Sequence, residues 1–376
     1  MDRRGFVSTG MAAGLAGAGV AGSGLGGLLS RSGLFRVGKT LPNGNVRLSS
    51  NENPLGLSPK AREALIDAIV DANRYPSSAD LTNALASYLG VQPAHLTLGF
   101  GSTEILQVIT HAYQGPSVPL IVAEPTFEDI GDYQATMAYN VVSIPLTKDL
   151  QHDVGRMREA ASKRPSVVYF CNPNNPTGTV TAAADIDAWI ADAPETTTFV
   201  MDEAYLEYVT DPRYGHCLKW VDQKPNVIVV RTFSKIFAMA GLRLGYAVSH
   251  PDTAVRLREW TVQNSPNVLA AAAGIASLQD DGLVARSVKV NEEARAIVHT
   301  TLDELGLEYL PTNTNFIMHR ISGDLTTYID RMRNEGLLVG RRFPPMLEWN
   351  RVSFGLPDEM DRWAATLKDF RKKGWV

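Results

Sequence analysis

The stretch NVIVVRTFSKIFAMAGLRLGY, residues 226–246, has a lysine where a buried strand is expected to end. Apolar residues at 227–230 predict that strand, and Lys235 follows it after a short segment with two hydroxyl side chains. A lysine on a surface loop would extend into water. Ligands, however, bind at the carboxyl ends of strands in open α/β sheets, and a partly desolvated lysine there becomes an amine nucleophile. The rest of the chain decides between these interpretations.

Composition excludes several classes of function. The 376 residues, 44% of them hydrophobic, are enough for two domains or for one large domain with a smaller one. The net charge of −4 gives no basic surface for nucleic acid. The two cysteines, Cys171 and Cys217, and the seven histidines have no metal-ligand spacing, so we expect neither a metal site nor a disulfide framework.

The first thirty residues differ in kind from the rest. Arg3 and Arg4 precede a weakly hydrophobic run of glycine and alanine without acidic residues. This pattern resembles a twin-arginine export signal and predicts a periplasmic or exported protein. So much glycine disfavours a membrane span, and we expect none. The alternative is a disordered tail on a cytoplasmic protein.

Apolar segments alternate with helical segments through the middle of the chain. Strands that are buried along their whole length predict an α/β fold, a mostly parallel sheet with helices on both faces. Shorter strands after a long helix at 283–306 indicate a smaller α+β domain. The expected parts are a leader (1–30), an arm with part of the small domain (31–74), a large domain (75–282) and a C-terminal small domain (283–376). Strands are predicted within 46–48, 95–99, 118–124, 140–146, 166–171, 197–202, 226–231, 243–250, 307–310, 315–319, 337–339 and 351–355, and further helices at 59–72 and 80–89.

Chemically distinctive side chains follow several of these strands. Gly101, Ser102 and Thr103 stand where a helix begins, and the free N–H groups and dipole of a helix start favour an anion. The segment is neither a Walker loop nor a dinucleotide fingerprint. Asp202 ends an apolar strand and needs a partner there, which is a salt bridge, a helix cap or a protonated ring nitrogen. Tyr205 follows three residues later, and its phenol could point into the same site.

Two further segments allow a structural or a functional interpretation. Asn175 lies in the loop NPNNPTG (172–178), which is typical of a turn and also presents a side-chain donor. Phe127 in EPTF (124–127) is expected either in the core or with its ring face towards the site. The carboxyl ends of parallel strands meet at one edge of a sheet, so we expect these side chains to converge.

The order of these motifs resembles that of fold-type-I pyridoxal-phosphate aminotransferases. Within that family the chain is similar to the histidinol-phosphate aminotransferase group, through NENPLG (51–56), NRYP (73–76), NPNNPTG, DEAY (202–205) and RTFSKIFAMAGLRLGY (231–246). The resemblance extends over about residues 45–370. It implies an enzyme that uses pyridoxal 5′-phosphate and moves an amino group between an L-amino acid and a 2-oxo acid by a ping-pong mechanism.

The resemblance also implies a role for each cofactor residue. Lys235 would form the internal aldimine and shuttle a proton, and Asp202 would keep the ring nitrogen protonated. Tyr205 and Asn175 would hydrogen-bond the ring's 3-oxygen, and Phe127 would stack on the ring face. The phosphate would be held by Gly101, Ser102, Thr103, Thr232, Ser234 and Arg243.

Other implied roles concern the substrate and a second subunit. Tyr75 of NRYP would reach the phosphate bound to the neighbouring subunit, which implies a homodimer with shared active sites. Arg351 in WNRVSFG (349–355) would bind the substrate's α-carboxylate as a planar fork. Asn53 and Asn315 would line the same pocket.

The sequence departs from the resemblance at the substrate end. Histidinol-phosphate aminotransferases typically have an arginine directly after the GxxV strand to hold the substrate's phosphate, and this chain has Gly340 there. Histidinol phosphate is therefore the less favoured donor. Decarboxylation, elimination or cyclisation through the same aldimine, and a non-catalytic binding protein, are further alternatives. The next loop offers an anion site at Arg341 or Arg342, or an aromatic or aliphatic pocket at Phe343, Met346 and Trp349.

Overall fold

The structure is a computed structural model that describes residues 37–131, 137 and 139–376. The predicted leader, residues 1–30, lies outside the described residues. In the described part of the chain no single helix is long and apolar enough to cross a membrane, and α8 (Val268–Leu278) and α9 (Leu283–Leu305) reach that length and hydropathy only together, across an 85° bend.

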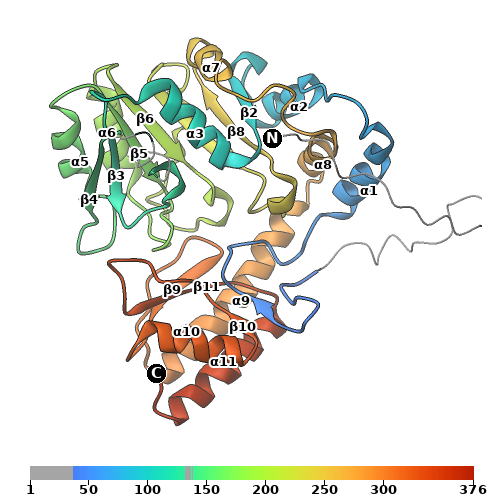
Figure 1. Cartoon of the computed structure of the whole chain (residues 1–376), viewed down its shortest axis with the longest axis vertical. Coiled ribbons are helices and arrows are strands. Elements are labelled where there is room, and N and C mark those ends of the chain that lie inside the picture. The colour runs from blue at the N-terminus through green and yellow to red at the C-terminus, as the bar shows by residue number, and fades with distance from the viewer. Residues whose placement is uncertain (1–36, 132–136, 138) are drawn as a thin grey trace, which may run out of the picture. The chain divides into compact units, whose positions relative to one another are not determined.

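A seven-stranded sheet in the order β2-β8-β7-β6-β5-β3-β4 forms the centre of the large domain (Figure 1). Strand β8 is antiparallel to both of its neighbours, and the other neighbouring strands are parallel. This confirms the predicted α/β fold with a mostly parallel sheet. The strands are β2 (Leu96–Gly99), β3 (Leu120–Glu124), β4 (Val141–Pro145), β5 (Ser166–Cys171), β6 (Thr197–Asp202), β7 (Val227–Thr232) and β8 (Gly245–Ser249).

Helices cover both faces of this sheet. Ile105 and Ile109 of α3 (Gly101–Tyr113) pack on one face in the same core cluster as Val167 and Val200. On the other face, the ring of Trp189 in α6 lies 5.0 Å from that of Phe199, edge to face. Since alternate residues of a strand point to opposite faces, a strand buried on both sides is expected to have an apolar centre, as residues 199–201 and 227–230 do. The remaining helices of the large domain are α1 (Pro59–Asp67), α2 (Ala79–Leu89), α5 (Val154–Ala161), α6 (Ala183–Asp192), α7 (Pro251–Arg258) and α8.

A second core cluster, formed by residues 46–48 and 294–376, is distinct from that of the sheet, and the part of the chain around it is called the small domain here. Its long helix α9 leaves the large domain beside α8 and packs against α11 (Figure 1). Helix α9 ends at Gly306, whose φ of 63° suits the left-handed cap that a glycine adopts without strain. The segment predicted as a strand at 307–310 makes only one isolated bridge, Tyr309 to His319. The other elements are α10 (Leu325–Asn334), α11 (Pro357–Lys372), the antiparallel pair β9 (Phe316–Arg320) and β11 (Trp349–Ser353), and the parallel pair β1 (Val46–Arg47) and β10 (Leu337–Leu338).

The N-terminal segment packs against both cores. Val46 of β1 belongs to the core cluster of the small domain, whereas α1 packs against α8 of the large domain. Helix α1 begins as predicted, with the Ser58 side chain accepting from the N–H of Ala61 at 3.2 Å. It ends at Asp67 rather than at Ala72, because the chain tightens into a 3₁₀ turn. The 3₁₀ turns are η3 (Ala68–Asp71), η4 (Pro93–His95), η5 (Leu206–Tyr208), η6 (Cys217–Trp220) and η7 (Ala240–Leu242).

Candidate active site

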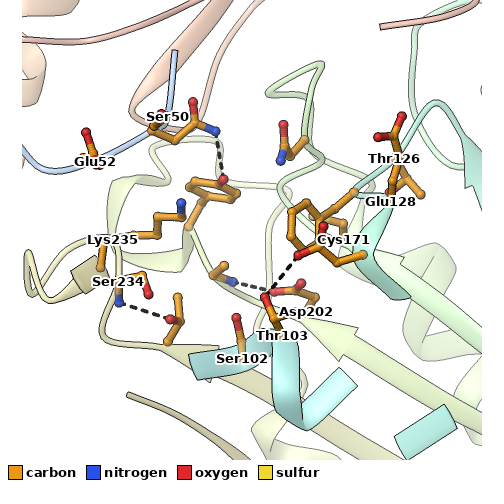
Figure 2. A pocket seen from close by; sticks show the side chains of 18 of the residues that line it. Ser50, Glu52, Ser102, Thr103, Thr126, Glu128, Cys171, Asp202, Ser234 and Lys235 are labelled. Carbon is orange, nitrogen blue, oxygen red and sulfur yellow. Dashed lines mark hydrogen bonds between the residues drawn. The ribbon is translucent and has the colours of Figure 1, made fainter. Parts of the chain in front are cut away.

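A cavity of about 400 Å³ lies where the carboxyl ends of β3, β5, β6 and β7 meet the start of α3 and two segments of the small domain. Figure 2 shows Lys235, Asp202, Ser102 and Thr103 around the same space. The structure therefore brings together most of the predicted site residues. Those that line the cavity are Ser102, Thr103, Phe127, Asn175, Asp202, Tyr205, Thr232, Ser234, Lys235, Arg243 and Arg351.

Lys235 follows β7 directly and is only partly exposed, at the wall of the cavity. Its Nζ lies 5.6 Å from the centre of the Tyr205 ring. Burial, together with the positive charge of Arg351, lowers the pKa of Lys235 to about 8. A sizeable fraction of this amine is therefore neutral near physiological pH, which is the form required for attack on a carbonyl group.

Asp202 is a buried carboxylate at the end of β6. Its Oδ2 accepts a hydrogen bond of 2.8 Å from the Tyr169 hydroxyl, and its Oδ1 accepts from the N–H of Ala204 at 3.1 Å. Burial raises the pKa of Asp202 to about 6, although the bond from Tyr169 opposes that rise. No Lys, Arg or His among the described residues forms an ion pair with it. A cationic ring N–H would remove this cost, so the site fits a protonated pyridine nitrogen.

The start of α3 forms an anion cradle with the loop after β7. A Cβ on Gly101 would lie 2.4 Å from Nη2 of Arg243, and a Cβ on Gly245 would lie 2.3 Å from the N atom of Ser102. Gly245 therefore has no room for a side chain beside the backbone of the helix start, and Gly101 has a φ of 82°, which L side chains rarely adopt. The Arg243 side chain is held by a hydrogen bond of 2.9 Å that its Nη1 donates to the carbonyl of Ala240. Helix N–H groups, hydroxyls and a guanidinium are the donors that a phosphate ester needs.

Arg351 of β11 also lines the cavity. Its Nη1 donates to Oδ1 of Asn175 at 2.6 Å, and its Nη2 donates to the carbonyl of Ser49 at 2.7 Å. Its Nε is buried and has no partner among the described residues. Burial lowers the pKa of Arg351 to about 10, so the guanidinium is still charged at neutral pH. A buried guanidinium with an unsatisfied donor fits the predicted role in binding a carboxylate.

Two predicted substrate residues, Asn53 and Asn315, are not among the residues that line the cavity. Asn53 donates to the carbonyl of Ile236 at 2.8 Å and to the hydroxyl of Ser287 at 2.9 Å. Asn315 donates to the carbonyl of Asn51 at 2.9 Å. Both amides are used to fix backbone next to the site. Two other residues of NENPLG, Asn51 and Glu52, do line the cavity, and Asn51 donates to the Tyr205 hydroxyl at 3.0 Å.

Tyr75 lies outside the cavity of this single chain and is 86% exposed. Tyr169 was not among the predicted site residues, because its contact with Asp202 depends on the pairing of β5 with β6. The alternation of β5 places Tyr169 on the same face as Cys171, which pairs with Asp202. That register was the only signal that could have identified it.

Steric overlap explains why position 340 is a glycine. A Cβ on Gly340 would lie 2.4 Å from the carbonyl oxygen of Arg351, and the N–H of Gly340 donates to that same oxygen at 2.8 Å. The end of β10 thus approaches the backbone of the carboxylate-binding arginine too closely for any side chain. The arginine of the histidinol-phosphate pattern does not fit here.

Replacing Gly340 by alanine is expected to destabilise the protein by roughly 1–3 kcal/mol, because the added methyl group overlaps a backbone atom. It should also raise KM for amino donors, since Arg351 has to move. Urea unfolding and steady-state kinetics measure the two effects. Gly115→Ala is the control, because no atom lies within 4 Å of the Cβ it adds. Equal unfolding free energies for the two variants would contradict the steric argument.

Some side chains that follow Gly340 line the cavity, and others pack in the core. Arg341 and Phe343 line the cavity. Met346 packs with Leu310 and Met318 in a small buried cluster, and Trp349 packs against that cluster. Of the aromatic and aliphatic side chains proposed for a pocket, only Phe343 contributes to its wall.

The comparisons with known proteins agree with this geometry. Residues 43–367 match the family model described as aminotransferase class I and II. A histidinol-phosphate aminotransferase of Moorella thermoacetica is 37% identical over 297 residues, which are 78% of this chain and 77% of the relative. An aromatic amino acid aminotransferase of Thermobifida fusca is 34% identical over 344 residues, 90% of this chain and 95% of the relative. The solved structure of a histidinol-phosphate aminotransferase from Sinorhizobium meliloti in complex with pyridoxal-5′-phosphate has 29% identity and a TM-score of 0.82, over 87% of this chain and 90% of that one.

Proposed function

The chain belongs to the class I and II aminotransferase family and is a pyridoxal-phosphate-dependent transaminase, and from this premise we propose how its own residues bind the substrates. An L-amino acid enters with its α-carboxylate on Arg351, and a 2-oxo acid takes the same place in the second half of the reaction. The observation that supports this is the position of Arg351, Lys235 and Asp202 around one cavity.

Each of these residues performs a separate step. When bound, pyridoxal phosphate supplies an electron-withdrawing ring that makes the donor's Cα–H acidic. Lys235 Nζ takes that proton from Cα of the donor, and in the second half of the reaction it returns a proton to Cα of the new amino acid. Asp202 holds the positive charge of the ring nitrogen, and Arg243 holds the phosphate. The fork of Arg351 fixes the α-carboxylate and thereby sets the orientation of Cα towards Lys235.

The test is a titration of the cofactor-loaded protein with single L-amino acids in the absence of an oxo acid. A productive donor is expected to bleach the visible band of the bound cofactor, and an added 2-oxo acid is expected to restore it. Ammonia or carbon dioxide released without an acceptor would instead indicate elimination or decarboxylation. The two curated relatives are named for different donors, so family membership leaves the donor open.

We also propose a homodimer in which Tyr75 reaches the phosphate of the neighbouring subunit. Tyr75 and the nearby Val70 are 86% and 80% exposed in the single chain, and exposed apolar side chains of this size favour an interface. Sedimentation equilibrium measures the oligomeric state, and a fully active monomer would refute the proposed homodimer.

The location of the protein remains a separate proposal, export through a twin-arginine signal. Its support is the pair Arg3 and Arg4 before the run of glycine and alanine. N-terminal sequencing of the protein from a periplasmic fraction tests it, and an intact leader found only in the cytoplasm would refute it.

A further inference from the structure

Two side chains of opposite charge meet at the wall of the cavity. Glu128 follows β3 of the large domain, and Arg341 follows β10 of the small domain. Arg341 Nη2 donates to Glu128 Oε2, and Arg341 Nη1 donates to the carbonyl of Arg342 at 2.9 Å. The guanidinium also lies over the ring of Phe343, at 4.3 Å from its centre. The orientation of Arg341 is thus set by three contacts.

The other cations of the cavity already have a function. Lys235 and Arg243 serve the cofactor, and Arg351 serves the α-carboxylate. Among the described residues that line the cavity, Arg341 is therefore the one cation left for the donor's side chain, and Glu128 neutralises it.

Two further carboxylates line this space. Glu52 lines the cavity and pairs with Arg47, which does not line it. Asp129 lines it as well and accepts from the hydroxyl of Thr103 at 3.1 Å. An anionic side chain of a donor would meet these carboxylates without gaining an unpaired cation.

Aromatic rings provide the apolar part of the same wall. Phe343 lies between two guanidinium groups, 4.3 Å from that of Arg341 and 4.7 Å from that of Arg351. Phe127 lines the cavity next to Glu128 in the chain. Because the guanidinium groups lie over the Phe343 ring, its apolar edge is the part that favours an uncharged, flat side chain.

We propose that Glu128 determines donor specificity: by neutralising Arg341 it adapts the cavity to amino acids with uncharged aromatic side chains and disfavours carboxylate- or phosphate-bearing ones. This inference rests on the proposed function. The pair is half-exposed, with 57% of the Arg341 side chain and 49% of the Glu128 side chain accessible, so it contributes little to folding. Its effect is on the ligand, which must displace Glu128 before its own anion can contact Arg341.

The experiment compares wild type with Glu128→Gln as cofactor-loaded protein, using L-phenylalanine, L-glutamate and O-phospho-L-serine as donors. Wild type is expected to prefer phenylalanine by at least about tenfold in kcat/KM. Glu128→Gln is expected to raise kcat/KM for the two anionic donors roughly fivefold, through KM, and to leave phenylalanine within about twofold. Adding Arg341→Gln should remove that gain.

Glu348→Gln is the matched control. Glu348 forms a half-exposed pair with Arg320, and neither residue lines the cavity. This variant is expected to leave all three donors unchanged. Calorimetric binding of 3-phenylpropanoate and glutarate to the same proteins gives a readout that needs no turnover, and Glu128→Gln should strengthen only glutarate binding.

A wild-type preference for the anionic donors would overturn the inference, and so would an equal effect of Glu128→Gln on all three donors. Failure of every donor to bleach the cofactor would instead refute the proposed function. In that case the two analogues would still report whether Glu128 controls the charge of the bound ligand, so the two failures are distinguishable.

Discussion

Replacing Lys235 by alanine is expected to reduce the rate of amino transfer by about 10⁴-fold or more, because one side chain supplies both the amine nucleophile and the proton carrier. The cradle of α3 and Arg243 is untouched by the change, so the cofactor should still bind through its phosphate. Stopped-flow absorbance during a single half-reaction measures the loss separately from product release.

A second readout concerns attachment of the cofactor. Borohydride treatment of the loaded wild type is expected to add the mass of the reduced cofactor to the peptide that contains Lys235, whereas the alanine variant should release its cofactor on unfolding. Lys163→Ala is the control, since Lys163 is exposed and only pairs with Glu159 at 4.0 Å. A rate of amino transfer in Lys235→Ala within tenfold of the wild-type rate would exclude the proposed role of Lys235 as nucleophile and proton carrier.

The sequence predicted those parts of the site that depend on local pattern. Asp202 ends an apolar run and Lys235 follows one after a short polar segment, and runs of this length that are rich in β-branched residues favour strands. Gly101 precedes a helical segment, which predicts the helix start that the structure shows. Because strand ends of a parallel sheet converge, three local predictions were enough to locate a common cavity.

The parts that were wrong or missed depend on contacts between distant segments. Asn51 and Asn53 are equivalent in a motif, and only the packing of Ile236 and Ser287 against Asn53 determines which of them lines the cavity. Glu128 and Arg341 are 213 residues apart, so no spacing rule links them.

The glycine at position 340 also depends on a contact between distant segments. Gly340 could be recognised as a departure from a family pattern, but its cause is the backbone of Arg351 on a neighbouring strand. The residues proposed to determine specificity are thus brought together by tertiary packing, and local sequence pattern does not link them.

Asp202→Asn is expected to slow amino transfer by roughly 10²–10³-fold, because the amide cannot stabilise a positive ring nitrogen. The same change should stabilise the cofactor-free protein at neutral pH. Burial raises the pKa of Asp202 from 3.8 to about 6, so the folded protein binds this proton more tightly than the unfolded chain does. Ionised Asp202 therefore costs stability, and the cost increases as the pH rises from about 4 to about 6.

The size of that cost follows from the rise of the Asp202 pKa from 3.8 to about 6 and is of the order of 2–3 kcal/mol. Cofactor-free Asp202→Asn should exceed wild type by this amount in unfolding free energy at pH 7.5, and the difference should vanish near pH 4. Urea unfolding across that range measures it. If the unfolding free energies of the two proteins changed with pH in parallel, burial would not destabilise the ionised form of Asp202.

Tyr169→Phe separates the position of Asp202 from its charge. Loss of the 2.8 Å hydrogen bond removes an interaction that lowers the pKa of Asp202, so that pKa should rise further. The acidic limb of the activity profile is then expected to move to higher pH, while the rate at its plateau falls less than in Asp202→Asn. A plateau loss as large as that of Asp202→Asn, with no shift of the limb, would mean that Tyr169 only supports the fold. Together, the two variants test whether the protein tolerates an unfavourable buried carboxylate because the bound ring nitrogen requires it.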